Sequence, residues 1–324
     1  MSIGSTSRNH HWIPQCYLKG FSRSRSKNAK LFVVDAIGRK TFNTVPRNIA
    51  SARDFNRIEI DGVSPDQIES DFSHFEGNVD RALQRVIESR QLGNTEDHNL
   101  ILNLIALLSA RNPRTRENSR QFQEKVIKQM MGLTVAKKER YEASYKQAIE
   151  AGFLTSHDDI AYETIRDFVK NDQYTIEVPT TRHIEQELRL VDTILPLLGE
   201  RNWLLLRAPA NTSGFVTSDH PVVLQWSSHR ERGFFNSPGF ALRDTEVIFP
   251  ISNELAMIGS FEVNNEVIDA NIKVMAVING AIIAHSNRQV YARDDRFQYS
   301  LSRDVIRWGA DVLKDLASPS VSSL

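Results

Sequence analysis

An acidic side chain and an imidazole are neighbours in one short segment between two apolar runs, Thr217-Ser218-Asp219-His220-Pro221. Proline disfavours helical backbone at the residue before it, so we expect His220 to be extended. The segment is predicted to be a loop at the end of a strand, where folds commonly present reactive side chains. Asp219 and His220 are therefore the first candidates for catalysis.

A carboxylate beside an imidazole suits hydrolysis of a bond whose transition state develops positive charge on a sugar. Asp219 would stabilise the cation or orient water, and His220 would stabilise the departing anion or deliver a proton. The alternative is a simple turn in which Asp219 caps backbone N–H groups. The sequence leaves both interpretations open.

A second polar cluster lies near the N-terminus, in the segment Asn9-His10-His11-Trp12-Ile13-Pro14. Adjacent histidines on an extended chain point to opposite sides, so one can face a site while the other packs inside. His10 and His11 are candidates for catalysis without a metal, for a metal site with Asp219 and His220, or for a structural role. No His-Glu-x-x-His or His-x-His spacing is present, and we predict neither a metal nor another cofactor.

Two arginines stand where a long apolar helix turns polar, in the segment Arg111-Asn112-Pro113-Arg114. Proline interrupts a helix, so we expect a kink or break here. Arg111 and Arg114 are candidates for phosphate contacts. The alternative is a solvated helix face whose arginines pair with Glu117 and Glu124.

Asn9, Trp12 and Tyr17 complete the candidate substrate-binding residues. Basic side chains surround these positions in the sequence, namely Arg8, Arg23, Arg25, Lys27 and Lys30. Aromatic residues beside basic ones suit the bases and phosphates of nucleic acid. The alternative is that Trp12 and Tyr17 belong to the hydrophobic core.

The composition excludes several classes of protein. Among 324 residues, 40 basic and 40 acidic side chains give a net charge of zero, so no global basic field drives binding to nucleic acid. The single cysteine excludes an intramolecular disulfide. Without an apolar run of membrane-spanning length or a signal peptide, a cytoplasmic protein is expected. Motifs of kinases, dinucleotide-binding dehydrogenases and α/β-hydrolases are absent.

Hydrophobic periodicity predicts an α+β fold: a helical middle region and a mostly antiparallel C-terminal sheet, joined by an N-terminal hairpin. We expect one composite domain over residues 1–324, divided into an N-terminal part (1–60), a helical region (61–200), a sheet-containing region (201–316) and a disordered tail (317–324). The predicted helices are 64–90, 99–131 with a break at Pro113, 136–150, 157–171, 181–198, 269–285 and 300–316. The predicted strands are 31–35, 40–45, 174–178, 203–207, 215–217, 222–225, 247–251, 255–258 and 288–292.

Several of these segments together resemble domain-of-unknown-function family 4238. Residues 10–21 resemble its opening signature, residues 111–114 its arginine-proline element, and residues 217–222 its Thr-Ser-Asp-x-Pro-Val element, in which Asn is usual at the position of His220. Phe249-Pro250-Ile251, Asn279 and Tyr291 fit the end of the pattern. The resemblance implies a shared fold and little about activity. The His220-Pro221 pair is also similar to a His-Pro segment of uracil-DNA glycosylases, whose glycine-rich motif is not visible here.

Our leading hypothesis is a hydrolase that acts on nucleic acid. Within that class we favour a DNA glycosylase that removes a modified base from phage DNA in bacterial defence. Such an enzyme must extrude its target base from the helix. A metal-dependent nuclease using His10, His11, Asp219 and His220 is the first alternative, and a non-enzymatic sensor or binding module is the second. No membrane partner is expected.

Overall fold

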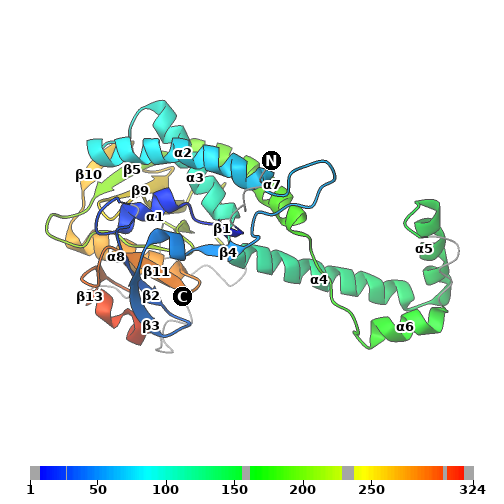
Figure 1. Cartoon of the computed structure of the whole chain (residues 1–324). Helices are drawn as coiled ribbons and strands as arrows, with labels where there is room; N and C mark the ends of the chain where they lie inside the picture. The colour runs from blue at the N-terminus through cyan, green and yellow to red at the C-terminus, as the bar shows by residue number, and fades with distance from the viewer. Residues whose placement is uncertain (1–7, 27, 155–160, 228–236, 302–304, 317–324) are drawn as a thin grey trace, which may run out of the picture. The chain divides into compact units, whose positions relative to one another are not determined.

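The computed structural model describes residues 8–26, 28–154, 161–227, 237–301 and 305–316. The chain forms two compact units (Figure 1). Unit 1 contains Met1–Asn112 and Ile184–Leu324, and unit 2 contains Pro113–His183. The N-terminal and C-terminal parts of the described chain therefore share one unit. The single domain expected from the sequence stays a prediction, and its tail at 317–324 lies outside the described residues.

The larger sheet of unit 1 has the strand order β10-β5-β9-β8-β7. Its strands are β5 (Asn202–Arg207), β7 (Val223–Trp226), β8 (Thr245–Pro250), β9 (Leu255–Ser260) and β10 (Glu266–Asp269). β10 runs parallel to β5, whereas the other neighbours are antiparallel. Alternation along β5 places Trp203 and Leu205 in one buried cluster and Leu206 in another. Both faces of the sheet are therefore covered.

The smaller sheet joins the N-terminal hairpin to strands from the C-terminal half, in the order β3-β2-β11-β6. Its strands are β2 (Leu31–Asp35), β3 (Lys40–Thr44), β6 (Thr217–Ser218) and β11 (Gln289–Ala292). Asp35 is buried at the end of β2, where its carboxylate accepts a 2.8 Å hydrogen bond from Arg288. The Arg288 guanidinium, with the Gly38 N–H, lowers the pKa of Asp35 to about 2. This ion pair ties the hairpin to β11.

Helices supply the apolar side chains that cover the larger sheet. The helices α2 (Gln67–Ser89), α3 (Thr95–Ala110) and α7 (Thr180–Gly199) contribute to one cluster, and α8 (Ile272–His285) contributes to the other. Asn94 caps α3, because its side chain accepts a 2.8 Å hydrogen bond from the Asp97 N–H. The helix ends before Pro113, which has no N–H to continue it. Each fully buried Leu or Ile contributes about 1.5–3 kcal/mol.

Shorter elements complete unit 1: β1 (Asn9–His11), α1 (Gln15–Leu18), β4 (Ser51–Arg53), β12 (Gln298–Tyr299), β13 (Arg307–Trp308) and α9 (Val312–Leu316). β1 pairs with β4, and β12 pairs with β13. In the described part of the chain, no helix is both long and apolar enough to cross a membrane.

The chain leading into β6 lies close to the β8–β9 turn at Gly214 and is hydrogen-bonded to α8 through Asn279. Gly214 has a φ of +77°, and a Cβ atom there would lie 1.7 Å from the Asn253 carbonyl oxygen. The buried Asn279 side chain accepts a 2.9 Å hydrogen bond from the Val216 N–H. Its amide donates to the carbonyl oxygens of Gly214 at 3.0 Å and Gln298 at 2.8 Å.

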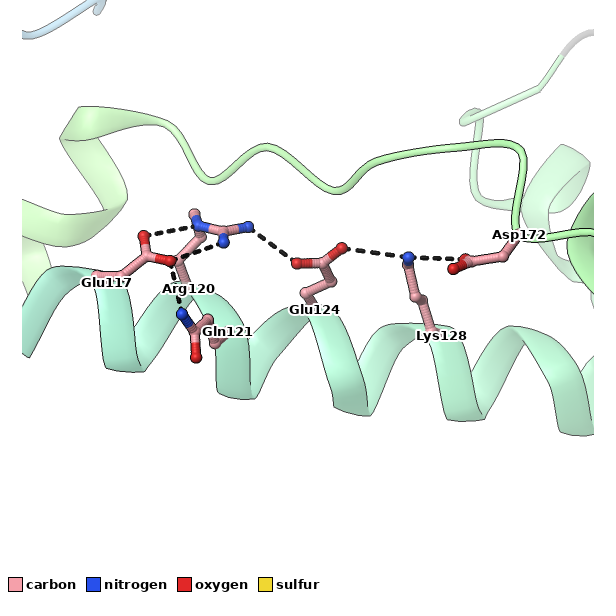
Figure 2. Close-up of polar contacts among 6 residues, drawn as sticks. All are labelled: Glu117, Arg120, Gln121, Glu124, Lys128 and Asp172. Carbon is pink, nitrogen blue, oxygen red and sulfur yellow. Dashed lines mark hydrogen bonds and ion pairs between the residues drawn. The ribbon is translucent and has the colours of Figure 1, made fainter.

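Unit 2 is helical in its described residues, with α4 (Pro113–Val135), α5 (Lys138–Glu150) and α6 (Tyr162–Lys170). Figure 2 shows a row of charged side chains along α4. Arg120 pairs with Glu117 at 2.8 Å and with Glu124 at 2.9 Å. Lys128 continues the row to Asp172 at 2.6 Å. Such exposed pairs contribute about 0.3–0.5 kcal/mol each.

The predicted α+β fold class is confirmed, including the mostly antiparallel sheets, the N-terminal hairpin and the helix break before Pro113. Two predicted elements are wrong. Residues 174–178 form no strand, and the described part of 300–316 is helical only near its end. There, β13 pairs with β12, and a Cβ atom at Gly309 would lie 2.4 Å from the Phe297 ring. Strand pairing and this close packing override the helix-like spacing of the apolar residues.

Gly214→Ala should destabilise the protein by more than about 2 kcal/mol, because alanine is strained at positive φ and its methyl group would meet the Asn253 carbonyl. Gly77→Ala is the control, since a Cβ atom there meets nothing within 4 Å. That change inside α2 should stabilise the protein by about 0.5–1 kcal/mol. Urea unfolding measures both effects, and equal stabilities for the two variants would contradict this account.

Candidate functional site

Three sequence motifs meet at the C-terminal end of α3, within unit 1. The Arg111 guanidinium donates a 2.8 Å hydrogen bond to the His11 carbonyl oxygen. The neighbouring Asn112 side chain donates a 3.0 Å hydrogen bond to the Asp219 carbonyl oxygen. The two residues at the helix end therefore link the N-terminal histidine pair to the segment that contains His220.

Arg111 is only 1% exposed, so its charge depends on partners inside the protein. Its guanidinium donates a second 2.8 Å hydrogen bond to the Asn56 side-chain oxygen. The guanidinium carbon also lies 4.2 Å from the centre of the Phe72 ring and 5.6 Å from that of Phe55. Aromatic faces attract a buried cation, which explains how a fully desolvated arginine is accommodated here.

His10 is buried and held by a backbone contact. Its Nδ1 accepts a 2.9 Å hydrogen bond from the Asn56 N–H, so the ring carries its proton on Nε2. That N–H is buried and has no hydrogen-bond partner among the described residues, and the same is true of the Trp12 indole N–H. Residues two apart on an extended chain lie on the same side. Two donors near the start of the chain are therefore left without acceptors.

His11 lies on the other side of the same segment and is partly exposed. Its Nε2 donates a 3.2 Å hydrogen bond to the Arg47 carbonyl oxygen. Burial lowers the pKa of His11, and the nearby Arg111 charge adds to that effect. The expected division of the pair, with one histidine packed inside and the other more accessible, matches this arrangement.

Two glutamates on α2 join the cluster, and sequence reasoning missed both. Glu69 accepts a 2.5 Å hydrogen bond from the Asn56 side chain. Glu76 is partly buried, and burial raises its pKa to about 7, with the Arg111 charge opposing and the Glu69 charge adding to the shift. Glu69, Phe72 and Glu76 share one face of the helix because they are three and four residues apart. That spacing was the signal available in the sequence.

Asn56 joins the parts of this group and was also missed. Its N–H, its side-chain oxygen and its side-chain amide contact His10, Arg111 and Glu69, respectively. We call His10, His11, Asn56, Glu69, Glu76 and Arg111 the polar cluster. It combines a buried guanidinium, two carboxyl groups and two imidazoles, and its carboxyl groups and imidazoles are of the types that exchange protons.

The Asp219 carboxylate is hydrogen-bonded to the backbone that follows α8. Its two carboxylate oxygens accept hydrogen bonds from the N–H groups of Asn287 at 2.9 Å and Arg288 at 2.8 Å. Burial raises the pKa of Asp219, and these backbone N–H groups act in the opposite direction. The geometry is that of a carboxylate capping backbone N–H groups, although the capped residues lie in another loop. Asp219 therefore has a structural role.

His220 stacks on His285 of α8, with ring centres 4.4 Å apart and planes 21° apart. Its own N–H donates to the Ser218 hydroxyl oxygen at 3.1 Å. Neither His10 nor His11 forms a hydrogen bond to Asp219 or His220 among the described residues. The N-terminal motif and this loop are linked through Arg111 and Asn112 rather than by direct contact of their candidate side chains.

The remaining candidates lie in different surroundings. Tyr17 is fully buried, and its hydroxyl donates a 2.8 Å hydrogen bond to the Pro250 carbonyl oxygen and contacts the Thr217 hydroxyl at 2.7 Å. It belongs to the core, which was the alternative expected from the sequence. Asn9 is exposed in β1, and the Trp12 ring lies 5.9 Å from that of Phe55. Arg114 belongs to α4 of unit 2, whereas the polar cluster belongs to unit 1.

Within the described ranges, no group of three or more His, Cys, Asp or Glu side chains is arranged to hold a metal ion. His10, His11, Asp219 and His220 therefore do not form the ligand set that the nuclease alternative requires. Cys16 is buried, which raises the pKa of its thiol to about 12 and makes it a poor nucleophile.

Comparison with known proteins gives one finding. The model of the family described as "Protein of unknown function (DUF4238)" matches residues 9–296. The match includes all three motifs that meet at the end of α3. Neither the curated proteins nor the solved structures gave a significant match.

Asp219→Asn should lower the free energy of unfolding by about 1–3 kcal/mol, because an amide NH₂ cannot accept one of the two backbone hydrogen bonds. His220→Ala should cost less, since it keeps the Asp219 carboxylate and both of its backbone hydrogen bonds. Urea unfolding compares the two variants with the wild type. A fully stable Asp219→Asn variant would remove the structural role assigned to this carboxylate.

Glu76→Gln should change how stability depends on pH. The folded protein holds the Glu76 proton up to about pH 7, above the ordinary value of 4.5, so wild-type stability falls as pH rises through this window. Glutamine stays neutral, and the variant should gain on the order of 3 kcal/mol relative to wild type above the window and almost nothing below it. Urea unfolding at pH 4.5 and pH 8 tests this, and an equal difference at both values would contradict it.

Proposed function

The chain belongs to the family of proteins of unknown function DUF4238, and on that premise we propose that it is a nucleic-acid-directed hydrolase. Within that class we favour a DNA glycosylase that removes a modified base from phage DNA in the bacterial cytoplasm. The observation that carries the proposal is the polar cluster, which lies where the family motifs meet. It contains a guanidinium, an ionisable carboxyl and a buried imidazole N–H that has no acceptor among the described residues.

Glu76 is the proposed catalytic residue. Its pKa of about 7 gives comparable amounts of the acid and the carboxylate at neutral pH, which suits proton transfer. In the proposed step, a water oxygen bonds to the sugar C1′ carbon while the C1′–N bond breaks. The water passes one proton to the Glu76 carboxylate, and the base leaves with the electron pair and takes up one proton from solvent, to which Glu76 then returns the proton it received.

Arg111 and Asp219 act in this proposal as positioning residues. Arg111 lies close enough to oppose the pKa shift of Glu76, and its contacts to His11 and Asn56 fix its own place. The Asp219 carboxylate fixes its own loop, and the Asp219 carbonyl oxygen accepts the hydrogen bond from the Asn112 side chain. The role of orienting water, which the sequence suggested for Asp219, thus moves to Glu76, and His220 remains a candidate for contact with the departing base.

A non-enzymatic sensor or binding module is the second candidate function. The observation that favours it is the engagement of both Asp219 oxygens and of the Tyr17 hydroxyl inside the protein. Motif residues that support the fold can be retained for that reason alone. This candidate predicts that substitutions in the polar cluster change stability without affecting any DNA.

The first measurement is incubation of the purified protein with unmodified and base-modified phage DNA, with and without chelator, followed by an abasic-site probe. Abasic sites that form in chelator are expected. Glu76→Gln should slow their formation about 100- to 10,000-fold, which is the usual contribution of general acid–base catalysis. Glu88→Gln, an exposed position on the same helix, is the matched control and should keep the wild-type rate.

The other outcomes decide between the alternatives. Direct strand breaks that disappear in chelator would replace the proposal by the metal-dependent nuclease. Unchanged DNA under all conditions would favour the binding module. Equal rates for the Glu76→Gln and Glu88→Gln variants would remove Glu76 from the mechanism even if abasic sites form.

A further inference from the structure

A set of adjoining cavities surrounds Arg293 on unit 1, away from the residues of the polar cluster. The largest has a volume of about 740 Å³, and three smaller ones of about 390, 220 and 160 Å³ also have Arg293 in their walls. The largest shares residues 210–212 with one neighbour, and two of the smaller ones share Asn253 and Glu254. We call these joined cavities the arginine groove.

Five arginines line the groove, namely Arg23, Arg25, Arg90, Arg293 and Arg296, against three carboxylates, Glu254, Asp294 and Asp295. Three of the arginines have acidic partners: Arg25 lies 4.0 Å from Asp80, Arg90 lies 3.6 Å from Glu254, and Arg296 lies 3.3 Å from Asp294. The groove therefore has an excess of positive charge in a protein whose net charge is zero.

Arg23 and Arg293 distinguish the groove from an ordinary salt-bridged surface. Both side chains are exposed, and neither forms an ion pair or hydrogen bond through its guanidinium in the described part of the chain. An uncommitted guanidinium presents a planar fork of donors that matches phosphate oxygens. Two such groups in one groove suit a ligand with more than one phosphate.

The largest cavity also offers an aromatic surface. Trp308 of β13 lines it and is 53% exposed, an unusual state for so large an apolar side chain. Asn211, Thr212 and Gln298 line the same cavity and supply hydrogen-bonding groups. Aromatic faces beside a basic track are the recurring means of holding unpaired bases.

We propose that the arginine groove binds a single strand of nucleic acid, with phosphates at Arg23 and Arg293 and a base stacked on Trp308. A single strand fits better than a duplex, because a paired and stacked base has no free face to offer the indole. This assignment rests on the proposed function, because it takes the bound strand to be the substrate of the polar cluster. It adds that this substrate is single-stranded.

The helix α2 connects the groove with the proposed catalytic residue. Ile87 and Arg90, at the C-terminal end of this helix, line the groove, and Glu76 lies 14 residues before Arg90, roughly 21 Å along the helix axis. Asp80, one turn after Glu76, faces Arg25 of the groove. The groove would therefore bind nucleotides of the strand that lie some distance along it from the nucleotide that reacts at Glu76.

The test is fluorescence anisotropy with a labelled single-stranded 12-nucleotide DNA, the same sequence as a duplex, and a mononucleotide as competitor. The wild type should bind the single strand more tightly than the duplex. Arg293→Glu should weaken this binding at least tenfold, and Trp308→Ala should weaken it about 5- to 150-fold, the usual range for loss of one base–aromatic stack. Arg39→Glu is the matched control, since Arg39 is exposed in the β2–β3 turn outside the groove, and it should change binding less than twofold.

Salt dependence gives a second readout that a misfolded variant would not imitate. The double variant Arg23→Ala/Arg293→Ala should reduce the slope of log affinity against log salt by about 1.4, because each phosphate contact on a single strand contributes about 0.7. Circular dichroism and melting curves confirm that the variants are folded.

Three outcomes would overturn the assignment: equal losses for Arg293→Glu and Arg39→Glu, duplex binding as tight as single-strand binding, or full displacement by the mononucleotide at equal concentration. The last would make the ligand a free nucleotide. Glu76→Gln separates the two proposals, since it should bind the strand normally and form abasic sites about 100- to 10,000-fold more slowly than the wild type. Strand binding without any base removal would uphold the groove and reject the glycosylase.

Discussion

A buried guanidinium has to be paired, and this requirement at Arg111 orders the N-terminal part of unit 1. Taking a charged group out of water costs several kcal/mol unless partners replace the lost hydration. The partners here are the His11 carbonyl, the Asn56 side chain and the rings of Phe55 and Phe72. Because these come from β1, from the chain after β4 and from α2, one side chain fixes three segments at once.

The constraint extends through the next residue into the C-terminal half. Asn112 contacts the Asp219 carbonyl, and the Asp219 carboxylate holds the N–H groups of Asn287 and Arg288. Arg288 in turn pairs with Asp35 of the N-terminal hairpin. The contacts therefore form a continuous series through unit 1, and they explain why motifs more than 200 residues apart in the sequence meet in one region.

The sequence predicted those features that depend on local pattern. Apolar periodicity located the hairpin and most helices, and Pro113 located the break after α3. The prediction failed where contacts between residues distant in the sequence determine the secondary structure. At Gly309, close packing against Phe297 and the pairing of β13 with β12 exclude the predicted helix.

In the candidate site, too, features visible in the local sequence were predicted, and features that depend on long-range contacts were not. The sequence identified Arg111 and the histidine pair by residue type, but it suggested chemistry for Asp219, whose oxygens are engaged by the backbone. Asn56 was missed because nothing in its sequence neighbours marks it, and the only sequence signal for Glu76 was its helical spacing from Glu69 and Phe72. Their significance arises from burial and from the nearby Arg111 charge, which exist only after folding.

The pairing of β2 with β11 affects how the protein folds during its synthesis on the ribosome. Asp35 lies opposite Gln289, so the central pair of the smaller sheet joins residues 254 positions apart. At typical synthesis rates of 5–20 residues per second, the N-terminal hairpin emerges from the ribosome roughly 10–50 s before its partner strand exists. During that interval β2 presents an unpaired edge and an apolar face, the features by which nascent chains aggregate or recruit chaperones. Unit 1 is thus completed only after β11 has been synthesised, and truncation before β11 should leave a chain that the cell handles as misfolded.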